Sequence, residues 1–175
     1  MQHFRVKLFA ETAAGFDLGN FIPVFHRWIQ SKALPGLLMD VADYRHVPSG
    51  PGVVLIGHDA HYSMDQGKRR LGLLYSRRTA AEGSAAELIR EAYGAAREAA
   101  RKIEQEPEFA GKIRFPGEFE VSVNDRMLAP NSEESWKALE PALTAALNAE
   151  LGAGRFRVER TGERRELLTA RVNAV

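Results

Sequence analysis

The 175-residue chain contains no cysteine. This absence excludes disulfide bonds, thiolate nucleophiles, iron–sulfur clusters and cysteine-ligated zinc, so any metal would need histidine and carboxylate ligands. No apolar run approaches the roughly 18 residues of a membrane span. The first residues, MQHFRVKLFAET, alternate polar with apolar side chains and lack the apolar centre of a signal peptide. Together these features predict a cytoplasmic protein with no membrane partner.

An excess of either charge is also missing, because 24 lysines and arginines balance 23 aspartates and glutamates for a formal charge of +1. Nucleic-acid-binding domains usually carry a basic excess. The most basic segment, residues 154–171, has six arginines but also three glutamates. The charges there interleave with a strand period, which is more typical of a solvated hairpin than of a phosphate-binding surface. We therefore expect no nucleic-acid partner.

Signature motifs of catalysis are absent as well. The loop HVPSGPG at residues 46–52 lacks the spacing of a phosphate-binding loop, and no serine lies in the G-x-S-x-G pattern of a nucleophile elbow. No motif names a reaction or a cofactor, so we expect no cofactor.

The composition that is present indicates a globular protein with a proper core. Hydrophobic residues make up 45% of the chain and charged residues 27%. A chain of this length and composition predicts a single domain over residues 1–175, with a boundary between two halves, if one exists, near residues 79–84.

Hydrophobic periodicity predicts the order of elements. Apolar residues alternate at 4–8, as in a strand, and recur at helical spacing over 21–29, where Trp28 lies on the apolar side. Ser84 and Glu87 form a capping box at the start of the longest predicted helix. A third helix carries Trp136, ends at Gly152 and contains Pro141, which predicts a kink or two abutting helices.

The resulting order is β-α-β-β-β, a long helix, and β-α-β-β. We therefore predict an α+β fold, a mostly antiparallel sheet with helices packed on one face. The repeated order is compatible with two β-α-β-β units joined by the long helix.

The segment VVLIGHDAHYSMD, residues 53–65, combines a buried apolar run with two histidines and two aspartates. We interpret it as one strand of a long hairpin that spans 53–78. Alternation along a strand then places His58 and His61 on opposite faces, so that they cannot share a metal ion. Asp59 and His61 share a face, but their cross-strand neighbours offer lysine and arginine rather than a third ligand. We therefore predict no metal site.

The other face of the predicted hairpin carries our candidate ligand-binding residues. The pairing brings Tyr75 or Arg77 opposite His58, with Tyr62 beside them. An apolar surface with a few convergent polar groups is the usual composition of a ligand pocket. A histidine on such a face is also commonly a hydrogen-bonded core residue, so both interpretations stand.

Two hypotheses for function follow. The first is a non-catalytic small-ligand-binding or accessory protein that forms a homodimer through the 53–78 hairpin. The dimer is expected because the hairpin has apolar residues on both faces, and both faces must then be covered by other parts of the protein or by a second subunit. The second is a small cofactor-free enzyme in which His58 is the catalytic acid or base. In that enzyme Tyr62 or Tyr75 donates a hydrogen bond and Arg77 holds an anionic substrate. The expected partners are a second copy of the chain and a small anionic or amphipathic ligand.

Overall fold

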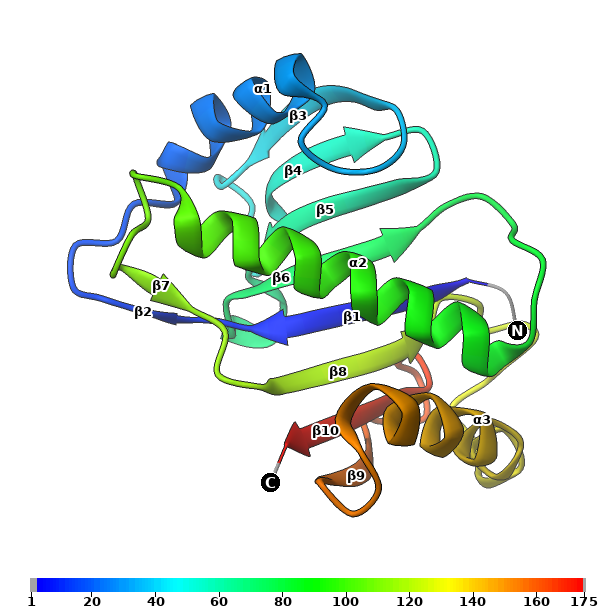
Figure 1. Ribbon diagram of the computed structural model, residues 1–175. Coiled ribbons are helices and arrows are strands. Elements are labelled where there is room, and N and C mark those ends of the chain that lie inside the picture. The colour runs from blue at the N-terminus through cyan, green and yellow to red at the C-terminus, as the bar shows by residue number, and fades with distance from the viewer. Residues whose placement is uncertain (1–2, 175) are drawn as a thin grey trace.

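The computed structural model describes residues 3–174 and confirms the predicted α+β fold. An antiparallel sheet of eight strands is the main element of this part of the chain, and three α-helices pack against one of its faces (Figure 1). Its strands are β1 (Phe4–Phe9), β3 (Leu38–Tyr44), β4 (Gly52–Gly57), β5 (Ala60–Asp65), β6 (Gly72–Arg77), β8 (Glu118–Val123), β9 (Phe156–Thr161) and β10 (Thr169–Ala174). The short strands β2 (Glu11–Thr12) and β7 (Ile113–Arg114) form a second sheet.

The strand order is β3-β4-β5-β6-β1-β8-β10-β9, so the first strand of each half, β1 or β8, lies in the interior and the two pair with each other. In the first half, β1 is followed by a helix, by the edge strand β3 and by strands that lead back to β1. In the second half, β8 is followed by a helix, by the edge strand β9 and by β10, which pairs with β8. The second half is the predicted β-α-β-β unit. The first half contains two additional strands in its returning segment.

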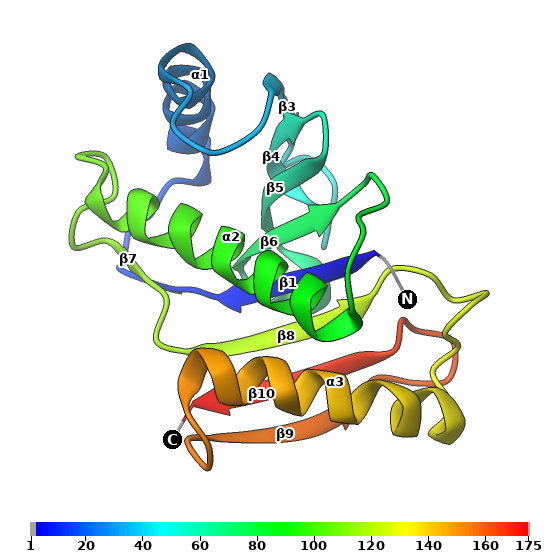
Figure 2. The same cartoon turned by 45° about the vertical axis from the view of Figure 1, so that its right-hand side comes forward.

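The three helices are α1 (Phe21–Ser31), α2 (Ala85–Gln105) and α3 (Glu133–Leu151). Figure 2 shows α2 crossing the middle of the twisted sheet, between α1 and α3. The helix α2 contacts β1, β6 and α3, whereas α1 packs on β3 and β4 and α3 packs on β9. The predicted capping box is present at the start of α2: Ser84 Oγ accepts from the Glu87 backbone N–H, and the Glu87 carboxylate accepts from that of Ser84.

The core lies between the sheet and the helices. Phe4, Val6 and Leu8 of β1 point into it, and Trp28 is only 3% exposed there. Trp136 is only partly buried, at the edge of this core. The helix α3 runs unbroken through Pro141, so the alternative of two abutting helices is wrong. Pro141 lies on the exposed side of α3, where solvent can satisfy the carbonyl that loses its partner.

The prediction of one long hairpin over 53–78 is also wrong. The chain turns at His58 and Asp59, so the segment 53–65 forms two strands, β4 and β5, with Leu55 opposite Tyr62. The apolar run and the alternating segment after it follow one strand pattern, and no Asn-Gly or Asp-Gly pair marks the turn between them. His58 therefore lies on neither face of a strand.

The pairing of the next two strands also differs from the prediction. Tyr62 lies opposite Tyr75, and Ala60 rather than His58 lies opposite Arg77. The three strands β4, β5 and β6 are flanked by β3 and β1, so both outer edges of the 53–78 segment are paired. The segment is therefore part of the large sheet and not the separate hairpin through which the homodimer was expected.

Candidate functional site

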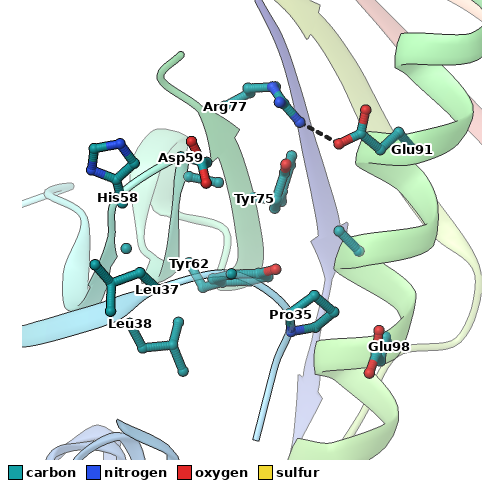
Figure 3. A pocket seen from close by; sticks show the side chains of 14 residues that line it. Pro35, Leu37, Leu38, His58, Asp59, Tyr62, Tyr75, Arg77, Glu91 and Glu98 are labelled. Atoms are coloured by element: carbon teal, nitrogen blue, oxygen red, sulfur yellow. Dashed lines mark hydrogen bonds and ion pairs between the residues drawn. The ribbon is translucent and has the colours of Figure 1, made fainter. Parts of the chain in front are cut away.

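A cavity of about 370 Å³ lies between the β4–β5 turn, the loop before β3 and helix α2. The candidate residues all line it, although they reach it differently from the prediction. Tyr62, Tyr75 and Arg77 extend from β5 and β6, whereas His58 belongs to the turn (Figure 3). The cavity lies on the helix-covered side of the sheet.

The two tyrosines form the floor of this cavity. They are direct cross-strand partners, and their ring centroids lie 5.3 Å apart in an edge-to-face arrangement. Burial raises the pKa of Tyr62, and the neighbouring Tyr75 and the carboxylates of Glu98 and Glu91 raise it further. Burial also raises the pKa of Tyr75, against the opposing effect of Arg77. Both phenols are therefore protonated near neutral pH and can serve as hydrogen-bond donors or aromatic walls, but not as bases.

The charge of Arg77 is already compensated. Its guanidinium forms an ion pair with Glu91 on α2 (Figure 3). Its Nε also donates to the Thr79 carbonyl at 3.2 Å. Two further carboxylates, Asp59 and Glu98, line the same cavity, and neither forms a salt bridge within residues 3–174. With His58 neutral, the lining carries a formal excess of two negative charges. This distribution favours a neutral or cationic group over the anionic substrate predicted for Arg77.

His58 lies on the opposite side of the cavity from Glu91 and Glu98 (Figure 3). Its backbone N–H donates to the Leu37 carbonyl at 2.8 Å, which anchors the turn against the loop before β3. Its imidazole is exposed and makes no side-chain hydrogen bond to another described residue. A catalytic base is normally oriented by a hydrogen-bonded partner, so the geometry supports a rim position better than a catalytic role.

The residues that the sequence interpretation missed come from α2 and from the segment 35–38, the loop before β3 and the first residue of that strand. Glu91, Ala95 and Glu98 follow the i, i+4, i+7 spacing of one helix face, and the small Ala95 leaves space between the two acids. This spacing can be read from the sequence. The sequence does not show which strand this helix face contacts, because the contact joins residues far apart in the chain.

The described residues contain no cluster of three or more histidine, aspartate or glutamate side chains that could hold a metal ion. Asp59 lies in the turn and His61 on β5, so the pair considered above does not share a strand. No helix within residues 3–174 is long and apolar enough to cross a membrane.

Comparisons of the chain with protein-family models, with curated proteins and with solved structures find no match. Its function is therefore argued from the cavity itself.

Proposed function

We propose that the protein is a non-catalytic ligand-binding protein whose helix-side cavity takes a small amphipathic molecule with a cationic end, such as a primary amine. The observation that carries this proposal is the pair of carboxylates, Asp59 and Glu98, that lie without an ion-pair partner beside aromatic and aliphatic side chains. An ammonium group would compensate one of these two negative charges. The proposal keeps the first hypothesis drawn from the sequence and assigns a charge to the ligand.

The size and lining of the cavity support a small ligand. Its volume of about 370 Å³ falls at the lower end of the roughly 300–1,000 Å³ typical of ligand pockets. Leu38, Ala60 and Ala95 offer contacts for an apolar body. The faces of tyrosine rings attract cations, so Tyr62 and Tyr75 are compatible with an ammonium group as well as with the apolar part.

Hexylamine, hexanol and hexanoate test this proposal, because they share a carbon chain and differ in the charge of the end group. We expect calorimetry to show that hexylamine binds most tightly and hexanoate most weakly. Replacement of Glu98 with glutamine should weaken hexylamine binding about tenfold, which corresponds to about 1.4 kcal/mol and is near the value of a hydrogen bond to a charged group. Glu134→Gln removes the same charge from α3, outside the cavity, and should leave binding unchanged. Preference for hexanoate, or unchanged hexylamine affinity in Glu98→Gln, would contradict the proposal.

The second hypothesis, a cofactor-free enzyme, is kept because His58 lines the same cavity as the tyrosines and Arg77. We expect His58→Gln to change hexylamine affinity by less than about twofold, since the imidazole lies across the cavity from Glu98 (Figure 3). A wild-type protein that converts a bound ligand, together with a His58→Gln variant that binds but does not convert it, would favour the enzyme.

The homodimer also stays a proposal, now at a different surface. The edge strand β3 has one strand neighbour, β4, and exposes Met39 and Tyr44, with Leu37 exposed directly before it. Two antiparallel β3 edges could pair around a two-fold axis. We expect light scattering at micromolar concentration to give twice the 19.4 kDa chain mass, and Leu37→Lys with Met39→Lys to give a monomer. A monomeric wild-type chain would exclude this dimer.

The cytoplasmic location stays a prediction from the sequence.

A further inference from the structure

A second cavity, of about 270 Å³, lies on the face of the sheet opposite the helices. Its floor is formed by β1, β8 and β10, and its sides by the turn η2 (Gly67–Arg69) and the loop before β10. Lys68 on η2 and Glu166 on that loop form an ion pair of 3.1 Å that joins the two sides. This cavity shares no residue with the helix-side cavity.

The register of the sheet aligns polar side chains in a row across this face. The row runs over six neighbouring strands and consists of Thr161, Thr169, Ser122, Arg5, Ser76 and His61. Arg5 lies near the middle of the row, on the central strand β1. A polar row would be ordinary if it were solvated, but Arg5 Nε, His61 Nδ1 and Thr161 Oγ1 are buried and have no hydrogen-bond partner in the described part of the chain.

Arg5 is the most unusual member of the row. Its Nε is buried and has no hydrogen-bond partner among residues 3–174, and none of the carboxylates there forms a salt bridge with it. Burial lowers the pKa of its guanidinium, and the charge of nearby Asp65 offsets this only in part. Even a half-buried guanidinium is unfavourable in a stable fold when it has no ion-pair partner.

The neighbouring cations differ from Arg5 because each has a carboxylate partner. Lys7 pairs with Asp65 at 2.6 Å, Arg70 with Glu118 at 2.7 Å, and Arg171 with Glu120 at 2.9 Å. The lining contains five cationic and three anionic side chains, and Glu118, just outside it, compensates Arg70. Arg5 is therefore the one cation of the lining that has no ion-pair partner among residues 3–174.

We propose that this second cavity binds a small organic anion, a carboxylate or a phosphate ester, with its charged group on Arg5. A guanidinium binds either group through two parallel hydrogen bonds. The hydroxyls of Ser122 and Thr169, 2.9 Å apart, lie next to Arg5 across the strands and supply further polar contacts. Phe9 and Leu74 line the cavity and can contact the apolar part of the ligand.

The side wall of the cavity is held in an unusual conformation. Lys68 and Arg69 have φ values of 56° and 57°, in the left-handed region that non-glycine residues seldom adopt. Lys7 holds this turn, because its ammonium group also donates to the carbonyls of Gly67 at 3.1 Å and Arg70 at 2.7 Å. Such backbone conformations persist where the surroundings enforce them and cluster at ligand-binding segments.

Calorimetry with benzoate, phenyl phosphate, inorganic phosphate and the neutral benzyl alcohol tests the proposal. We expect benzoate or phenyl phosphate to bind the wild-type protein more tightly than benzyl alcohol does. Arg5→Met should weaken this binding at least tenfold and leave the thermal midpoint unchanged or higher, because it removes a half-buried charge that has no ion-pair partner among residues 3–174. A residue with only a structural role would lower the midpoint. Arg114→Met, which removes an exposed arginine paired with Glu11 on the small sheet, should leave anion binding unchanged.

Two controls keep the outcomes distinct. If Arg5→Met does not fold, Arg5→Lys replaces it as the test variant. Lysine keeps the positive charge but cannot form the two parallel hydrogen bonds of a guanidinium, so we expect binding to weaken several-fold. The Glu98→Gln variant should retain full anion affinity, so failure of the amine proposal would not affect this one. Absence of binding by any anion, equal binding to Arg5→Met, or binding of inorganic phosphate alone would overturn the proposal of an organic anion.

Discussion

Replacing Asp65 with asparagine is expected to lower the free energy of unfolding by about 3–5 kcal/mol, the usual cost of leaving one member of a buried ion pair without its partner. The side chains of Lys7 and Asp65 are 10% and 14% exposed, and their charged atoms lie 2.6 Å apart. The Lys7 ammonium would keep its two carbonyl acceptors but lose the charge that compensates it. Chemical denaturation followed by circular dichroism measures the effect.

Two variants complete this experiment. Asp40→Asn removes a carboxylate from the exposed edge strand β3 and should change the free energy of unfolding by less than about 0.5 kcal/mol. Lys7→Met combined with Asp65→Leu removes both charges, and should cost less than Asp65→Asn alone because no buried charge is left over. A loss below about 1 kcal/mol for Asp65→Asn would show that water reaches Lys7 in the folded protein.

Replacing Trp28 with alanine is expected to destabilise the protein by about 3–5 kcal/mol, through lost burial and the cavity that remains. Trp28 packs against Phe25 with ring centroids 5.5 Å apart, and its indole N–H donates to Glu106 at 2.5 Å. Trp136→Ala is the matched comparison, because Trp136 is only partly buried and should cost clearly less. Equal losses in the two variants would contradict the packing described for α1 and α3.

The elements that the sequence predicted best depend on nearby residues. The capping box of Ser84 and Glu87 involves positions three apart, and the end of α3 at Gly152 follows from the backbone freedom of one glycine. The β4–β5 turn was missed although Gly57 and Asp59 are residue types that favour turns, because two strands joined there look like one alternating segment.

The candidate residues meet in one cavity for a reason that is partly local. A strand shift by an even number of residues keeps each side chain on its face, so Tyr62, Tyr75 and Arg77 share a face despite the altered pairing. Glu91 and Glu98 reach the cavity from α2, and this contact is the reason we propose a cationic ligand instead of the anionic one expected from Arg77. No pattern near Arg77 in the sequence indicates Glu91 as its partner.

The alternation in β1 by itself determined that Arg5 and Lys7 share one face and that Phe4, Val6 and Leu8 share the other, because side chains alternate along any strand. Whether the polar face meets water was decided only by the tertiary structure. Since β1 lies between β6 and β8, and the turn η2 and the loop before β10 close over it, Lys7 is buried with a partner and Arg5 lies half-buried without one. Those contacts join segments more than 50 residues apart, so their energies are not encoded in local periodicity.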